Sequence, residues 1–527
     1  MTAMASVRTL TALFELGAGR APTSCAIVDG PEVLDWTALR GRVDAAAARL
    51  AGAGIGDGDA VALWLPNSID YLALVFACAK LGALAVHINT RFGPSEVGDL
   101  LHRSRAKVLV TQWAFPPVDF PAVLSAIPQA NLTALKAVIG RHLPVQTRTL
   151  GTLSVLPLEG ASGSFSDQAR PDALALTFTT SGTTSGPKLV AHDQQSVAGH
   201  AVEVMHRLGL GHPNGVLLAA VPFCGTYGLT AVLAAMAGGA CVVCMDRFDP
   251  AVTAGLIRKH AVTHAIGGDD MLAKLMDAAG PEAFTSLKWF GFAAFSAGAA
   301  ATALSAIPMG LEPFGIYGSS ELQAFFAIGH GEGRLRSGGR LTRRRAEVSV
   351  RDPDTGAVLE PGQSGELWFK GPSRFAGYVG DDAATARAIT DEGWFRSGDL
   401  GYLEGDGFVF EARLGDTLRL GGFMVSPEEI EGFLAGLPGV CGAQVVGLEQ
   451  SGGMKPIAFV TALPGATLDP AGLIAACLGK IARYKVPSLI HVIDEFPTTD
   501  GPNGRKIQRA RLRQMAVALA SPEKRSA

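Results

Sequence analysis

The sequence TFTTSGTTSGPKLVAHD, residues 177–193, is the most informative stretch of the chain. Its small hydroxylated residues and glycines cannot build a core, but they leave backbone N–H groups and hydroxyls available to surround an anion. A plain linker has a similar composition, so the segment alone leaves both interpretations open. The Walker-type spacing GxxxxGK[ST] is not met, because Gly182 and Gly186 are one residue too close and Pro187 separates Gly186 from Lys188. The pattern therefore leaves a phosphate-binding loop or a linker open and disfavours a P-loop nucleotidase.

Short apolar strands and Ala-rich helices alternate on both sides of this loop, from about residue 25 to residue 350. Strand, helix and strand at this spacing predict parallel sheets with helices on their faces, here as two doubly wound layers. We expect strands at 60–66, 83–89 and 106–112 around a helix at 71–81. The same alternation predicts strands at 216–222 and 240–245 and helices at 228–239 and 250–260.

The pattern changes after Arg345 to period-two strands separated by Gly-rich turns, at 346–371 and 400–413, which favours antiparallel hairpins or a small barrel. A helix starting with Ser426 as its cap and Pro427 in its first turn begins a compact α+β unit. The predicted fold class is therefore α/β, with two doubly wound layers and a small β-barrel-like subdomain in a large N-terminal domain (1–412). A small, mobile α+β domain (413–527) follows.

Composition excludes several classes of protein. With 527 residues, 48% apolar residues and a net charge of −3, the chain is too long for one small module and unlike a disordered chain. The balanced charge gives no general attraction to nucleic acid. The uncharged runs at 216–245 and 289–311 contain Pro and Gly breakers, so no transmembrane segment is expected, and no secretory signal is visible. We expect a cytoplasmic protein.

The seven cysteines are odd in number and lie mostly in apolar runs, which predicts buried thiols rather than a disulfide framework. Cys241 and Cys244 form a CVVC sequence, but no second pair or suitably spaced histidine accompanies them. They are interpreted as core residues of a buried strand, and no metal site is assigned to them.

Five sequence blocks together resemble the adenylate-forming enzymes, the superfamily of acyl-CoA synthetases, peptide-synthetase adenylation domains and luciferase. TSGTTSGPK at 180–188 resembles the loop TSGTTGxPKG, although Ser185 and Leu189 replace glycines of that pattern. In the same order as in the family follow YGSSE at 317–321, GWFRSGDLGY at 393–402, the hinge block at 413–431 and RKIQRARLR at 505–513. The resemblance spans nearly the whole chain and is strongest to an acyl-CoA synthetase.

This resemblance implies two half-reactions, in which an acid and ATP give acyl-AMP and pyrophosphate, and CoA then takes the acyl group as a thioester. Two anions meet in the first step, so cationic and N–H donors must neutralise the developing charge. The implied catalytic residues are Lys506, which contacts the acyl carboxylate and the α-phosphate, Ser320, a hydroxyl donor, and Glu321. Glu321 and Thr184 are the implied Mg²⁺ ligands.

The resemblance also implies the remaining nucleotide and CoA contacts. Tyr317 offers a ring on which adenine stacks, Asp399 accepts from the ribose hydroxyls, Arg413 assists there, and Gly415 takes the pivot position of the hinge. The implied ATP-binding set is Thr180, Ser181, Gly182, Thr183, Thr184, Lys188, Ser296, Ala297, Gly298, Tyr317, Gly318, Asp399 and Arg413. Gly421 and Gly422 are the implied CoA-binding residues, where the pantetheine arm passes close to the backbone.

The acyl substrate is predicted only by class. Gly225 stands where the family has a histidine, and Phe223 and Cys224 stand where amino-acid-activating relatives have an aspartate, so a free amino acid is disfavoured. The candidate pocket residues are small or apolar and favour an uncharged fatty, alicyclic or aryl acid: Tyr227, Gly267, Ala294, Gly315 and Phe325. An acyl-AMP ligase that loads a carrier protein, a luciferase-like oxygenase and a catalytically degraded nucleotide- or acyl-binding protein remain alternatives. A homodimer also remains open.

Overall fold

The computed structural model describes most of the chain and divides it into two compact units. The described residues are 7–20, 22–116, 118–160, 163–180, 187–280, 284–294, 299–414, 418–420, 423–425, 427–450, 453–478, 480–481, 483–501 and 504–520. Unit 1 comprises Met1–Ala293, Thr302–Glu347 and Phe369–Phe395, and unit 2 comprises Ala294–Ala301, Val348–Trp368 and Arg396–Ala527. The predicted boundary between residues 412 and 413 stays a prediction.

One sheet of unit 1 is built around the predicted strands at 60–66, 83–89 and 106–112. Its spatial order is β20 (Gly377–Tyr378), β10 (Leu189–Asp193), β9 (Leu174–Thr179), β4 (Leu84–His87), β3 (Ala60–Trp64), β5 (Val108–Gln112), β6 (Ala137–Arg141), β8 (Leu153–Pro157) and β7 (Thr149–Leu150). The strands from β9 to β8 pair in parallel, while β10 pairs antiparallel with β9 and β20. The strand–helix alternation therefore gives the expected parallel sheet.

The second sheet of unit 1 contains the predicted strands at 216–222 and 240–245. Its order within the unit is β17 (Gly338–Leu341), β16 (Gln323–Ile328), β15 (Glu312–Ser319), β14 (Trp289–Ala293), β13 (His264–Gly268), β11 (Val216–Ala219), β12 (Cys241–Cys244), β1 (Cys25–Asp29) and β2 (Glu32–Asp35). The CVVC sequence is strand β12, as predicted, and its Cys244 is buried, whereas Cys241 at the start of the strand is only half-buried.

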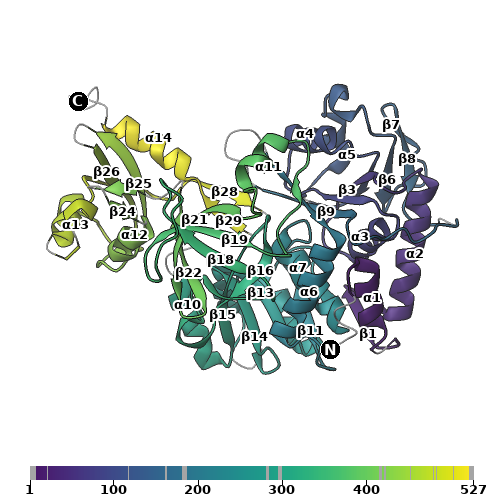
Figure 1. Ribbon diagram of the computed structural model, residues 1–527, viewed down its shortest axis with the longest axis horizontal. Coiled ribbons are helices and arrows are strands. Elements are labelled where there is room, and N and C mark those ends of the chain that lie inside the picture. Colours follow the sequence, from purple (N-terminus) through teal and green to yellow (C-terminus); the bar gives the residue numbers. More distant parts are fainter. Residues whose placement is uncertain are drawn as a thin grey trace. The chain divides into compact units, whose positions relative to one another are not determined.

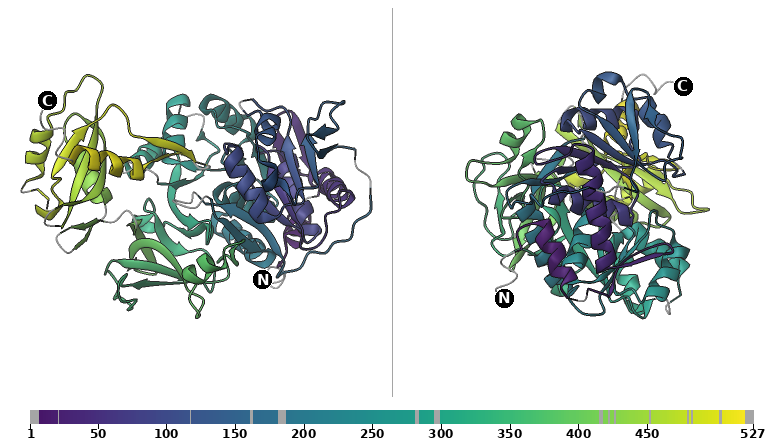
Figure 2. Two further views of the ribbon diagram at one scale, coloured as in Figure 1. Left: turned by 90° about the horizontal axis from the view of Figure 1, so that it is seen from above. Right: turned by 90° about the vertical axis from the view of Figure 1, so that its right-hand side faces the viewer.

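Helices cover these sheets. They are α1 (Leu10–Ala18), α2 (Trp36–Gly52), α3 (Ile69–Lys80), α4 (Pro94–Ser104), α5 (Phe120–Ser125), α6 (Gln194–Leu208), α7 (Thr226–Gly238), α8 (Pro250–His260), α9 (Asp269–Ala278), α10 (Ala299–Ala306) and α11 (Asp382–Ala388). Helices α6 and α7 lie side by side (Figure 1), and every residue of α7 is buried. Helices α1 and α2 also lie together (Figure 2), with the rings of Phe14 and Trp36 5.5 Å apart. None of the helices within the described ranges is long and apolar enough to cross a membrane.

Unit 2 contains two kinds of structure. Its hairpin strands are ordered β18 (Glu347–Arg351), β19 (Gly365–Lys370), β21 (Phe395–Glu404) and β22 (Gly407–Arg413), and β21 pairs antiparallel with β22. The α+β part has one sheet of three strands, β25 (Val440–Gln450), β26 (Gly453–Ala462) and β27 (Leu489–Val492). It also has two pairs of strands, β23 (Leu418–Leu420) with β24 (Phe423–Val425) and β28 (Thr498–Gly501) with β29 (Gly504–Ile507). Its helices are α12 (Pro427–Ala435), α13 (Pro470–Cys477) and α14 (Arg509–Ala520). Helix α14 lies along β25 (Figure 1), where Leu512 and Ala516 pack on Val446.

Strand order predicts where unit 1 binds ligands. Strand β11 pairs in parallel with β12 on one side and with β13 on the other, so the chain reverses its direction of winding there. In open α/β sheets, ligands bind outside the carboxyl ends of the strands at such a switch point. The loop after β11 leads to Tyr227 at the start of α7, and Gly267 is the last residue but one of β13, so two of the predicted acyl-pocket residues lie at this point.

Candidate functional site

The turn that carries Ser320 and Glu321 joins β15 to β16 and is fixed by its backbone. The buried ring of His192 donates through Nε2 to the carbonyl of Ser320 at 2.7 Å. The backbone N–H of Phe375 donates to the carbonyl of Glu321, also at 2.7 Å. Burial lowers the pKa of His192 to about 4, so its imidazole is neutral at neutral pH. The two predicted catalytic residues of unit 1 are therefore adjacent on a constrained turn.

Tyr378 connects this turn to the phosphate-loop lysine. Its hydroxyl donates to Oε1 of Glu321 at 3.0 Å. Lys188 Nζ lies 4.5 Å from the centre of the same ring, which is the geometry of a cation–π contact. Strands β10 and β20 pair Val190 with Tyr378, which explains why the lysine before β10 reaches this ring. The structure thus brings together Lys188 and Glu321, which the sequence singled out, through a tyrosine that it did not.

Gly318 is required by a close approach of backbone. A Cβ at this position would lie 2.5 Å from the carbonyl oxygen of Gln323, closer than real Cβ atoms come. Gln323 itself has a φ of 65°, in the left-handed region that non-glycine residues rarely adopt. Its buried amide donates to Ser196 Oγ at 2.9 Å and holds this conformation. The glycine of the YGSSE block is therefore a packing requirement of the turn.

The predicted acyl-pocket residues are only partly brought together. The hydroxyl of Tyr227 lies within hydrogen-bond distance of two backbone carbonyl oxygens, that of Gly267 at 3.0 Å and that of Gly291 at 2.7 Å. The rings of Tyr227 and Phe325 are 5.6 Å apart. By contrast, a Cβ at Gly315 would meet the carbonyl of Arg336 at 2.2 Å, so protein backbone occupies the space beside this glycine.

Other predicted residues of unit 1 have plainer surroundings. Tyr317 is 6% exposed, and its ring centre is 5.4 Å from that of Phe369. Thr180 follows β9, and its backbone N–H donates to the carbonyl of Lys188 at 3.1 Å, which closes the base of the loop. The following residues of the predicted ATP-binding set lie outside the described residues: Ser181, Gly182, Thr183, Thr184, Ser296, Ala297 and Gly298.

Within unit 2, Asp399 and Arg413 form an ion pair. They are cross-strand partners of β21 and β22, and Nε of Arg413 lies 2.9 Å from Oδ1 of Asp399. The carboxylate side chain is 4% exposed, and the N–H of Asp399 donates to Ser397 Oγ at 3.0 Å. The two residues predicted to contact ribose are thus adjacent, with the arginine already directed at the acid.

The segment that carries Lys506 is a short hairpin. Strand β29 pairs Lys506 with Thr499 of β28, and α14 begins three residues later at Arg509. The Lys506 side chain and the residues Gly415, Gly421 and Gly422 lie outside the part of the chain that the structure describes, so the hinge and CoA predictions stay predictions.

Ala294, another of the predicted acyl-pocket residues, is an exposed residue after β14.

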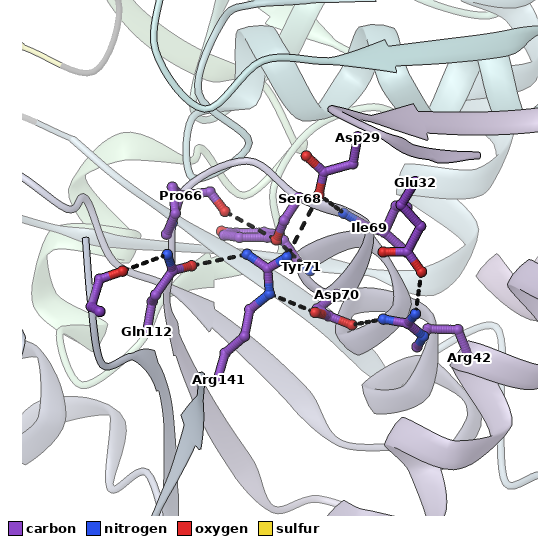
Figure 3. Close-up of polar contacts among 11 residues, drawn as sticks. Asp29, Glu32, Arg42, Pro66, Ser68, Ile69, Asp70, Tyr71, Gln112 and Arg141 are labelled. Atoms are coloured by element: carbon purple, nitrogen blue, oxygen red, sulfur yellow. Dashed lines mark hydrogen bonds and ion pairs between the residues drawn. The ribbon is translucent and has the colours of Figure 1, made fainter. Parts of the chain in front are cut away.

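A cavity of about 450 Å³ opens at the carboxyl ends of β1, β5, β6 and β12 in unit 1. Figure 3 shows the polar cluster at its wall, in which Asp70 accepts from Arg42 and from Arg141, both at 2.6 Å. Arg141 also donates to Gln112 at 3.0 Å. Asp29 lies 3.7 Å from Arg141, and burial raises the pKa of its carboxyl. This cluster ties α2, α3 and β6 together and fixes the shape of the cavity wall.

Comparison with known proteins matches nearly the whole chain. A family model described as AMP-binding enzyme matches residues 14–379, and one described as AMP-binding enzyme C-terminal domain matches residues 429–501. A 2-succinylbenzoate–CoA ligase of Geobacillus kaustophilus is 31% identical over 482 residues, 90% of this chain and 92% of that protein. An indoleacetate–CoA ligase of Aromatoleum aromaticum is 30% identical over 500 residues, with 92% and 94% covered. The ATP-bound structure of MatB from Rhodopseudomonas palustris superposes with a TM-score of 0.84 at 24% identity, covering 96% of this chain and 100% of that one.

Proposed function

This chain belongs to the AMP-binding enzyme family and is an AMP-forming acid:CoA ligase, and we propose that its substrate is an apolar carboxylic acid. Its cosubstrates are ATP and CoA. In the first half-reaction the acid attacks the α-phosphate of ATP and pyrophosphate leaves. In the second, the CoA thiol attacks the acyl-AMP carbonyl, AMP leaves, and the thioester forms.

The observation that carries the proposed site is the meeting of Lys188 and Glu321 on one tyrosine of unit 1. Attack of a carboxylate on a phosphate concentrates negative charge, and a cation next to a metal-binding acid is what such a step needs. We assign Lys188 to the phosphates leaving with pyrophosphate and Ser320 to the α-phosphate. Lys506 donates to the acyl carboxylate and the α-phosphate, and Asp399 accepts from the ribose.

The residues present fit a Mg²⁺ ion bound together with ATP. Glu321 supplies a hard carboxylate oxygen, and no cluster of three metal-binding side chains occurs among the residues that the structure describes. Mg²⁺ is commonly held by one or two carboxylates, with the remaining ligands coming from substrate phosphates and water. When bound, the ion would neutralise charge on the phosphates. Glu321 would hold it, and Thr184 is its second proposed ligand.

The apolar nature of the acid is argued from the residues around Tyr227. Phe325 is fully buried beside it, the side chains of Met271 and Phe290 lie against Gly267, and the Tyr227 hydroxyl lies within hydrogen-bond distance of two carbonyls. These buried, apolar surroundings offer no charged group for a second carboxylate or an amine. The names of the two relatives above specify acids with an aromatic ring. 2-Succinylbenzoate also carries a second carboxylate, for which the residues around Tyr227 offer no charged partner, and we propose for this chain an uncharged fatty, alicyclic or aryl group.

The proposal also covers where the protein lies in the cell and how it assembles. A cytoplasmic location suits an enzyme that consumes ATP and CoA, and a homodimer is the proposed assembly. The second half-reaction is proposed to use free CoA, with a turn of the C-terminal domain at Gly415 between the two steps.

Pyrophosphate exchange with a panel of carboxylic acids tests the first half-reaction, and AMP release with CoA tests the second. We expect exchange with aryl, alicyclic or fatty acids and little with amino acids or dicarboxylates, followed by CoA-dependent AMP release. Exchange without CoA-dependent release would instead support a carrier-protein ligase. No exchange with any acid would support a binding protein without catalysis.

A further inference from the structure

Tyr378 contacts two candidate site residues that are far from it in the sequence. It lies on β20, and 6% of its surface is exposed. Its hydroxyl donates to Glu321, and its ring faces the ammonium of Lys188. One buried side chain therefore contacts both the carboxylate of Glu321 and the ammonium of Lys188 in the proposed nucleotide site.

The hydroxyl of Tyr378 restrains the carboxylate of Glu321, which the backbone hydrogen bonds of the turn leave free to rotate. The carbonyls of Ser320 and Glu321 are held by His192 and Phe375, but the carboxylate can still rotate about its side-chain bonds. The Tyr378 hydrogen bond uses Oε1 and directs Oε2 elsewhere. Hydrogen bonds of this kind orient metal-binding carboxylates, and losing one commonly costs about 10- to 100-fold in metal affinity or activity.

The ring contact restrains Lys188. A lysine side chain carries about 2 kcal/mol of rotamer entropy, and holding its ammonium over an aromatic face removes part of that freedom before a ligand binds. Because the same ring carries the hydroxyl that holds Glu321, the separation of the two charged groups is set by one rigid side chain.

We propose that Tyr378 is a positioning residue, which orients Glu321 through its hydroxyl and Lys188 through its ring. The inference rests on the proposed roles of these two residues in binding Mg²⁺ and ATP. It assigns separate consequences to the two parts of the tyrosine, so substitutions can separate them. Tyr378→Phe removes only the hydroxyl, whereas Tyr378→Leu removes the ring as well.

The test measures binding rather than turnover. Mn²⁺ binding in the presence of α,β-methylene ATP is followed by electron paramagnetic resonance, and binding of metal-free ATP is followed by calorimetry in EDTA. For Tyr378→Phe we expect Mn²⁺ to bind about tenfold more weakly, with metal-free ATP bound as in the wild type. For Tyr378→Leu we expect metal-free ATP to bind about two- to fivefold more weakly as well. Tyr71→Phe is the matched control, because it loses a buried hydroxyl that bonds His87 at 2.6 Å.

Glu321→Gln separates the inference from the function on which it rests. If Glu321→Gln loses Mn²⁺ affinity and Tyr378→Phe does not, the positioning role is wrong and the proposed function stands. If Glu321→Gln binds Mn²⁺ as the wild type does, the proposed metal role itself is wrong. Equal weakening of metal-free ATP and Mn²⁺ binding in Tyr378→Phe, with a lowered unfolding temperature, would show a merely structural tyrosine and overturn the proposal.

Discussion

Arg509 donates to both carboxylate oxygens of Glu431, at 2.9 and 3.2 Å, and so ties the start of α14 to helix α12. The acid also accepts from the N–H of Val445 at 2.8 Å and is 1% exposed. Burial raises the pKa of Glu431 to about 7, although Arg509 opposes this change. Since Arg509 follows Lys506 by three residues, this pair anchors the hairpin that carries the proposed catalytic lysine.

Arg509→Lys should therefore impair the half-reaction that needs Lys506 more than the other. Lysine keeps the charge but loses the two-pronged geometry, and small displacements of a catalytic group can cost about 100-fold in rate. We expect pyrophosphate exchange to fall by about 10- to 100-fold, while conversion of supplied acyl-AMP and CoA to thioester changes by less than about threefold. Lys485→Arg, which alters the half-buried partner of the exposed Glu429, is the matched control. Equal losses in both half-reactions would contradict the anchoring role.

Gly318→Ala should destabilise the protein and disrupt the Glu321 turn. The added Cβ would overlap the Gln323 carbonyl, a backbone atom that cannot move without displacing β16. Overpacking of this kind typically costs about 1–3 kcal/mol. Gly255→Ala in the interior of α8 is the control, because nothing lies within 4 Å of its Cβ and alanine should stabilise a helix by about 1 kcal/mol. Urea unfolding of both variants measures the difference, and a neutral Gly318→Ala would refute the close-approach account.

The buried His192 should make the protein less stable in mild acid. Its pKa is about 4 in the folded protein and about 6.5 in the unfolded chain. Below pH 6.5 the unfolded chain therefore binds more protons than the folded protein, and the free energy of unfolding decreases as the pH is lowered. The contribution lost at pH 5 is about 2 kcal/mol. His192→Gln keeps a donor for Ser320 but does not titrate. Between pH 7 and pH 5, the free energy of unfolding should therefore decrease more in the wild type than in the variant. An equal decrease in both proteins would show that His192 is not responsible.

Local patterns predicted the fold because the strands β3, β4, β5, β11 and β12 of unit 1 are short, mostly apolar runs between turn residues. The helix expected at 250–260 is α8, with the predicted limits, because Pro250 marks its start and Asp249 caps it. The helix expected at 228–239 begins two residues earlier, at Thr226, since Gly225 is its N-cap. Boundaries such as this depend on a backbone turn that apolar periodicity does not reveal.

The sequence singles out candidate site residues where they lie in recognisable blocks, as Glu321, Asp399 and Arg413 do. The structure shows that the last two are cross-strand partners, and their roles stay predictions. Tyr378 and His192 were missed, because their importance comes only from contacts with Glu321 and Ser320 more than 50 residues away. A single sequence shows which residues can do chemistry, but not which distant side chains hold them in place.

The most direct test of the account separates the two half-reactions in Lys506→Ala. If Lys506 neutralises charge as acyl-AMP forms, the variant should lose pyrophosphate exchange by at least about 100-fold. It should still convert supplied acyl-AMP and CoA to thioester at a rate within about threefold of the wild type. Retained exchange, or the same loss in both half-reactions, would contradict the assignment of this lysine and the two-step mechanism built on it.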